Sequence, residues 1–150
     1  MQPFFTSPIT FDFRCASRLA LSVGILACAA IPVTGSASPL LRCQIDQGGK
    51  THMLEFAPVS DPYLVKAIDI NGRFRFKAVV IGDKRHIEYI KLYTYSQTKR
   101  QPVLLHEAKY LSPVALPGAA GSALTGLNFV YSPQLERELQ YACTLHEVAS

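Results

Sequence analysis

Apolar and polar residues alternate with a period of two along most of the chain after residue 38, in short runs rich in Val, Ile, Tyr, Phe and Thr. Each run predicts a β-strand, because alternate side chains of a strand point to opposite faces. The runs cover residues 40–46, 51–56, 63–70, 73–81, 86–96, 102–111, 124–131 and 137–145. No window of helical length in this region keeps apolar residues at spacings of three and four. We therefore predict an all-β domain, a small antiparallel sandwich or barrel of about eight strands.

Short turn sequences separate most of the early runs: "QGGK" at 47–50, "NG" at 71–72, "GDKR" at 82–85 and "QTKRQ" at 97–101. Strands joined by such turns are expected to lie as antiparallel neighbours. By the period of two, Cys43 shares a face with Leu41 and Ile45, and Cys143 shares a face with Leu139, Tyr141 and Leu145. Both cysteines are therefore predicted to point into the core. The simplest arrangement is one sheet that curls until its edges meet.

The N-terminal segment has the pattern of an export signal. Arg14 and Arg18 precede the apolar run "LALSVGILACAAIPV", which is short for a bilayer span, and small residues at Gly35 and Ala37 fit a signal-peptidase site. We predict a signal peptide at residues 1–37 and a single β domain at residues 38–150. Two alternatives stay open: a lipobox at "ILAC" with lipidation of Cys28, and an uncleaved anchor helix. The long segment before the apolar run leaves open whether Met1 is the true start.

Removal of residues 1–37 would take away Cys15 and Cys28 and leave Cys43 and Cys143, an even pair near the two ends of the domain. In an oxidising compartment such a pair predicts one disulfide between the first and last strands. The alternative is a reactive or metal-binding thiol pair. It is disfavoured because the cysteines lack CxxC spacing and a nearby basic cluster that would lower a thiol pKa.

The composition of the 150-residue chain, 49% hydrophobic and 17% charged, is that of one folded domain rather than a disordered segment. The formal net charge is +4, and the basic residues are spread along the chain. We therefore expect no nucleic-acid partner and, once the signal is removed, no stable membrane insertion. The predicted location is the periplasm or the cell exterior.

The stretch "INGRFRFK", residues 70–77, alternates basic residues and phenylalanines after a turn signal. A two-residue turn at Asn71 and Gly72 would pair Ile70 with Arg73 and Ile68 with Arg75, and so mix apolar and charged residues on each face. A three-residue turn at 70–72, which pairs Asp69 with Arg73, sorts the faces better and is the predicted register. Its inner face would carry Leu64, Ile68, Phe74, Phe76 and Ala78, and its outer face Arg73, Arg75 and Lys77 with Asp69.

The three cations Arg73, Arg75 and Lys77 have two interpretations. They can be an ordinary solvated strand face, or a basic strip that meets an acidic patch on a partner and accelerates association. The second is the binding hypothesis that the sequence offers.

Residues 112–126, "SPVALPGAAGSALTG", interrupt the strands with a long segment of small and apolar residues. A long loop in a compact domain is either a mobile connection or a functional element. If it is functional, Gly118 and Gly121 would let the backbone of a partner approach closely.

Tyr89, Tyr93 and Tyr95 lie on one side of the strand predicted at 86–96, with Ile90 and Leu92 on the other. We expect the tyrosine rings to be half-buried in the core with their hydroxyls at its wet edge. The alternative is an exposed aromatic face, which a loop or a partner would cover.

Residues with catalytic or metal-binding chemistry are few. His52, His86 and His106 fall in different runs and His146 directly follows the last one, without the spacing that places two ligands on one metal. GxSxG, Cys/His nucleophile and paired-carboxylate patterns are also missing from the sequence. We expect no cofactor, no metal and no catalytic activity. The alternative is a small envelope enzyme or metal-binding protein with a histidine-based site.

The layout of an exported, all-strand chain with a bridge from first to last strand resembles the small periplasmic barrels of the C-type lysozyme inhibitor group. The resemblance rests on this plan and on Cys43 and Cys143, and it implies inhibition of a muralytic hydrolase. The segment "PGAAGSALTG", residues 117–126, lacks the inhibitory motif of that group, so no functional residue is carried over. The main expectation is therefore a non-catalytic domain that binds another envelope protein, with hydrolase inhibition as the alternative.

Overall fold

The computed structural model describes residues 37–117, 121–133 and 136–149. By its contacts the chain divides into two units, residues 1–33 and 34–150, and the described residues all belong to the second. The predicted signal sequence, Cys28 included, therefore lies outside the described residues up to position 36. Ala37, the last residue of that predicted signal, is the first residue of the first strand.

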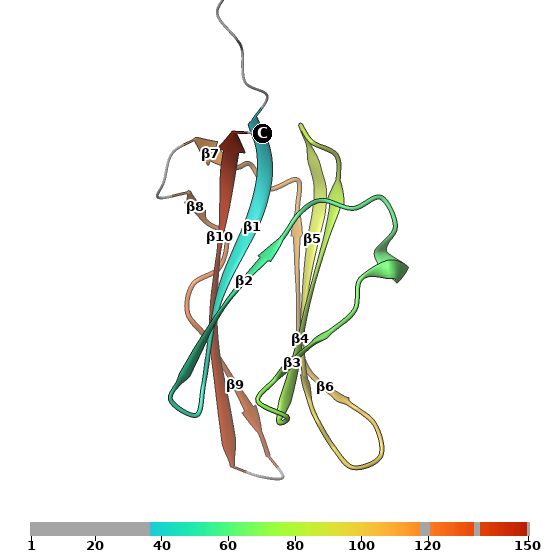
Figure 1. The fold of residues 1–150 in the computed structure, drawn as a ribbon, viewed down its shortest axis with the longest axis vertical. Helices are drawn as coiled ribbons and strands as arrows, with labels where there is room; N and C mark the ends of the chain where they lie inside the picture. The colour runs from blue at the N-terminus through green and yellow to red at the C-terminus, as the bar shows by residue number, and fades with distance from the viewer. Residues whose placement is uncertain (1–36, 118–120, 134–135, 150) are drawn as a thin grey trace, which may run out of the picture. The chain divides into compact units, whose positions relative to one another are not determined.

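The described unit is built almost entirely of β-strands (Figure 1). The elements are β1 (Ala37–Gln47), β2 (Lys50–Phe56), a 3-10 helix η1 (Pro62–Leu64), β3 (Ile68–Ile70), β4 (Phe74–Gly82), β5 (Ile87–Ser96), β6 (Val103–Leu111), β7 (Leu116–Pro117), β8 (Ser122–Ala123), β9 (Asn128–Ser132) and β10 (Arg137–Ala149). They form a six-stranded sheet with the order β2-β1-β10-β7, in which β8 and β9 also pair with β10, and a four-stranded sheet with the order β3-β4-β5-β6. All pairs are antiparallel except β7 with β10.

The two sheets make a sandwich, so the predicted single sheet that closes on itself is wrong. The meander breaks between β2 and β3, where residues 57–67 pass from one sheet to the other (Figure 1). The strand predicted at 63–70 is reduced to Ile68–Ile70, because Pro62 begins η1 and the side chain of Asp61 accepts a hydrogen bond from Tyr63 N (2.8 Å). Proline at the start of a helical turn, preceded by an Asp cap, is a helix-start signal.

The core lies between the sheets and confirms the alternation predicted for the first and last strands. Leu41, Cys43 and Ile45 of β1 are fully buried, as are Leu139, Tyr141, Cys143 and Leu145 of β10. Phe76 of the other sheet packs on Tyr141, with ring centroids 5.3 Å apart. Desolvation by this burial raises the pKa of Tyr141 to about 12, so its hydroxyl stays protonated.

The predicted disulfide between Cys43 and Cys143 is confirmed. The two residues are directly opposite each other in the β1–β10 ladder, with Cα atoms 4.1 Å apart. The bridge therefore joins strands that are already neighbours and fixes the register at the centre of the first sheet.

The β1–β2 hairpin has the predicted turn. Gln47 faces Lys50 across a two-residue loop, and Gly48 and Gly49 both have positive φ (59° and 76°). Such a turn requires left-handed backbone at both positions, which glycine adopts without a steric penalty.

The β3–β4 hairpin has neither register considered from the sequence. Ile70 faces Phe74 and Asp69 faces Arg75, so the loop consists of Asn71, Gly72 and Arg73. Asn71 adopts a φ of 54°, and its side-chain amide donates to the backbone oxygen and to Oε1 of Gln47 (3.0 and 2.9 Å). This long-range anchor to the β1–β2 hairpin holds the turn one position later than the sequence alone suggests.

The shift changes two details of the predicted faces. Arg73 lies in the turn, and Leu64 is 76% exposed on η1 instead of lying on the inner face. Because the shift from the predicted register is an even number of residues, Phe74, Phe76 and Ala78 still face the core, as predicted. Ile68 is 38% exposed at the sheet edge, and Ile70 is buried in its place.

The long segment after β6 pairs with β10. β7 and β8 each contribute two residues to the β10 ladder, and Leu124 N donates to Cys143 O (3.0 Å). Thr125 Oγ1 accepts a hydrogen bond from Cys143 N (2.9 Å). The described part of this segment is thus hydrogen-bonded to β10 and completes the sheet edge beside the disulfide; it is not an unpaired connection.

Candidate binding face

The outer face of the β3–β6 sheet gathers tyrosines and cations. Along β4 and β5 the inward positions are buried and apolar or small, whereas the outward positions carry long polar and aromatic side chains, except for the buried Val79 and Ile81 near the end of β4. We call this surface the tyrosine–lysine face and define it as Arg75, Lys77, Tyr89, Lys91, Tyr93, Tyr95, Glu107 and Lys109.

The tyrosine stripe is therefore on the opposite side from the expected one. Ile90 and Leu92 are fully buried in the core, and Tyr89, Tyr93 and Tyr95 are half-exposed on the outer face. The apolar side chains gain more from burial than tyrosines, whose hydroxyls need a hydrogen-bond partner or water. The alternative weighed from the sequence, an aromatic outer face, is the arrangement the structure has, with the three rings half-buried on it.

Close ring and cation contacts order this face. The rings of Tyr93 and Tyr95 stack with centroids 6.2 Å apart and an interplanar angle of 18°. Lys91 Nζ lies 5.8 Å from the centroid of Tyr93, and Lys109 Nζ lies 5.2 Å from that of Tyr89. Contacts of this kind restrict the side chains before any ligand binds, which reduces the entropy lost on association.

The charge on the tyrosine–lysine face is positive. Lys91 forms an ion pair with Glu107 (3.1 Å), and the hydrogen bond to Glu107 raises the pKa of Lys91. Within the described ranges, Arg75 and Lys77 have no carboxylate within salt-bridge distance. Of the predicted basic strip, Arg75 and Lys77 thus lie together on the face, and Arg73 lies in the adjacent turn.

A shallow hollow of about 250 Å³ opens beside these cations. Its lining consists of Pro62, Tyr63, Lys77, Val79, Tyr89, Lys91 and Tyr93. Tyr63 is 92% exposed at its rim, and Val79 is 3% exposed. Sequence reasoning missed Tyr63 because it was assigned to a strand; the cap signal at Asp61 and Pro62 could have placed it on a turn.

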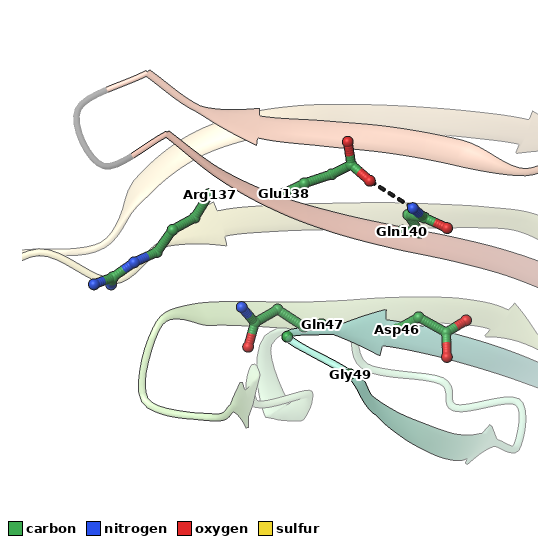
Figure 2. Close-up of a pocket in the computed structure, with 7 residues that line it drawn as sticks. Asp46, Gln47, Gly49, Arg137, Glu138 and Gln140 are labelled. Carbon is green, nitrogen blue, oxygen red and sulfur yellow. Dashed lines mark hydrogen bonds between the residues drawn. The ribbon is translucent and has the colours of Figure 1, made fainter.

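A second hollow, of about 390 Å³, lies on the first sheet near the β1–β2 turn (Figure 2). Glu138 accepts hydrogen bonds from the hydroxyl of Tyr131 and from Gln140, and these bonds lower the pKa of Glu138. The side chain of Arg137 extends away from Glu138 (Figure 2). Hydrogen bonds from Thr51 and Gln44 lower the pKa of Asp46. Both carboxylates are therefore ionised at neutral pH. A general acid needs a pKa near the working pH, and neither Asp46 nor Glu138 has the raised pKa that this role requires.

The four histidines lie in separate environments. His52 Nε2 is 3.2 Å from Asn71 Oδ1, His86 is exposed in the β4–β5 turn, and the ring of His106 is 5.9 Å from that of Tyr141. His146 is 7% exposed and bonds to the hydroxyl of Thr144 (2.7 Å). Across residues 37–117, 121–133 and 136–149, no group of three His, Cys, Asp or Glu side chains could hold a metal ion.

One of the two glycines proposed as contact points, Gly121, lies within the described residues. Gly118 lies outside the described residues. Gly121 has a φ of 61°, and a Cβ there would lie 2.7 Å from the ring of His146 and 2.9 Å from Leu145 O. The small size of Gly121 therefore has an internal packing role, and its contact with a partner stays a prediction.

Comparison of the chain with known proteins finds no matching family, no matching curated protein and no matching solved structure. In the part of the chain that the structure describes, no helix has the length and hydropathy needed to cross a membrane.

Proposed function

We propose that this protein is an exported, non-catalytic β-domain that binds another protein of the cell envelope through the tyrosine–lysine face. One observation carries the proposal: stacked, half-exposed tyrosines alternate with cations on the outer face of a sheet. Tyrosine and arginine are enriched in protein interfaces because they bury large area and form hydrogen bonds at a modest entropy cost.

The disulfide supports export, because such bonds persist in oxidising compartments such as the periplasm and the cell exterior. The sheet supports binding, because its side chains are presented on a rigid backbone and need little rearrangement on association. The hollow beside Tyr63 offers space for one side chain of the partner, and Lys77 and Lys91 in its lining favour an acidic one.

The first prediction concerns the cations of this face. Replacing Arg75 and Lys77 together by Ser should leave folding nearly unchanged and slow capture of the partner at low ionic strength, because exposed charges act mainly on the association rate. The partner is first identified by cross-linking in envelope extract, and association of the purified pair is then measured by stopped flow at two salt concentrations.

Two variants serve as controls for that measurement. Arg73→Ser removes a cation from the turn beside the face and should have a smaller effect, and Lys50→Ser removes one from the hairpin of the other sheet and should have none. An association rate that is the same in the double variant as in the unchanged protein would leave these cations a role in solubility alone. Identification of a muralytic enzyme as the partner would select the inhibitor alternative.

The second prediction concerns export. Cleavage after Ala37 should yield a chain that begins at Ser38, and intact-mass analysis of the protein from periplasmic extract measures this directly. A lipidated chain that begins at Cys28 would contradict it and place the protein on a membrane surface.

A further inference from the structure

β6 is the longest strand at a sheet edge in the described sandwich. It ends the second sheet and pairs there with β5 alone; a register shift leaves Leu105 without a partner in that ladder, so the regular edge runs over residues 106–111. The other strands that end a sheet are shorter, and β3 has just three residues. Soluble proteins usually shorten, bend or cover such an edge, because its unpaired backbone groups can bind another strand.

The hydrogen-bonding direction along β6 follows from its register. Ser112 N donates to Glu88 O (2.8 Å), and this continues the register in which Leu111 faces Tyr89. Hydrogen-bonded and non-hydrogen-bonded positions alternate in an antiparallel ladder, so the backbone groups of His106, Ala108 and Tyr110 point toward β5. Those of Glu107, Lys109 and Leu111 point to the free edge.

We propose that β6 pairs antiparallel with β6 of a second copy of this chain, about a two-fold axis through Ala108. This register places Glu107 of each copy opposite Lys109 of the other, and these are the positions whose N–H and C=O groups are free to exchange hydrogen bonds. The proposal does not rest on the partner proposed for the tyrosine–lysine face, and it shares with that face the two residues Glu107 and Lys109.

Charge selects this register over its neighbours. An axis through Glu107 would place Glu107 opposite itself, and an axis through Lys109 would place two lysines together, both of which destabilise a strand pair. With the axis at Ala108, opposite charges meet twice. Oε1 of Glu107 already accepts a hydrogen bond from Lys91, so Oε2 of Glu107 can accept one from Lys109 of the second copy.

The side chain at the axis also agrees with this register. The small side chain of Ala108 allows the close approach of two identical residues at the axis. In the resulting dimer the two four-stranded sheets become one continuous sheet, with both tyrosine–lysine faces on the same side.

Sedimentation equilibrium of the protein purified from cells that express the complete chain tests this dimer. The edge alone buries less than a standard interface, so we expect a dimer that dissociates on dilution. Glu107→Lys should weaken it about tenfold, because the substitution would bring two lysines opposite each other on both sides of the axis. Lys109→Glu should do the same, and the double swap Glu107→Lys/Lys109→Glu should restore dimerisation.

In the unchanged protein Lys91 bonds to Glu107. In the double swap the carboxylate moves to position 109, which faces Lys91 directly in the β5–β6 ladder, so Lys91 keeps one carboxylate beside it. A protein that stays monomeric up to about 1 mM, or a dimer that the single substitutions do not weaken, would overturn the proposal. So would a double swap that folds but fails to restore the dimer. Denaturant unfolding of each variant separates loss of pairing from loss of folding.

A cross-link tests the register without altering the charges. Ala108→Cys should form an intermolecular disulfide on mild oxidation, because opposite residues of a non-hydrogen-bonded antiparallel pair have Cα atoms about 4.5 Å apart. Ala123→Cys, an exposed position on β8 of the other sheet, is the matched control and should not cross-link. Equal cross-linking of both variants, or efficient cross-linking of Glu107→Cys in place of Ala108→Cys, would contradict the proposed axis.

Discussion

Removal of the Cys43–Cys143 disulfide is expected to lower the free energy of unfolding by about 2–5 kcal/mol. The bridge spans a sequence separation of 100 residues, and in the chain-entropy model a closed loop of that size gives about 4.7 kcal/mol. Urea unfolding of a Cys43→Ala/Cys143→Ala variant, compared with the oxidised protein, measures the difference. The double variant avoids leaving one unpaired thiol in the core.

The unchanged protein, unfolded in urea with a reductant present, is the control for that comparison. It should have the stability of the double variant, because both lack the constraint on the unfolded chain. Under native conditions the reductant should act slowly, since both cysteines are fully buried. Free thiols at positions 43 and 143 in the native protein, detected by alkylation, would contradict the expected loss of stability.

The elements that could be predicted from sequence are those whose determinants are local. The Gly48-Gly49 turn, the long strands β5, β6 and β10, and the inward direction of both cysteines follow from turn chemistry and a period of two. Pairing of the first with the last strand followed from the cysteine count. Each of these depends on residues that are close in sequence or on a covalent bond.

Features set by contacts between distant segments could not be predicted. The register of β3 and β4 depends on Asn71, whose amide bonds to Gln47 across the sandwich. The pairing of residues 116–117 and 122–125 with β10 likewise depends on backbone groups of Cys143 and its neighbours. These bonds join residues that are far apart in the sequence, so no pattern of neighbouring residues predicts them.

The candidate site shows the same division. Alternation placed Tyr89, Tyr93 and Tyr95 on one side of a strand, and placed Arg75 with Lys77, but the side of β5 expected to face the core was the wrong one. Both sides carry apolar or aromatic surface, so the decision depends on the facing sheet. Tyr63 joins the site through η1, which the strand pattern at 63–70 concealed.

Substitution of Gly82 by Ala is expected to destabilise the domain by about 3 kcal/mol, because the added Cβ would overlap backbone atoms. Gly82 ends β4 with a φ of 156°, at a register shift in the β4–β5 pair. A Cβ there would lie 2.2 Å from His86 O and 2.8 Å from Ile87 Cα. Neither atom belongs to a flexible side chain, so the hairpin itself must move.

Urea unfolding of Gly82→Ala measures this loss, and Gly126→Ala is the matched control. A Cβ at Gly126 would meet no atom within 4 Å, so this variant should differ from the unchanged protein by well under about 1 kcal/mol. Equal stability of the two variants would mean that the β4–β5 turn adjusts without cost. Since Asp83 N donates to His86 O (2.8 Å) and Tyr89 follows directly in β5, a displaced turn in Gly82→Ala should also weaken binding at the tyrosine–lysine face.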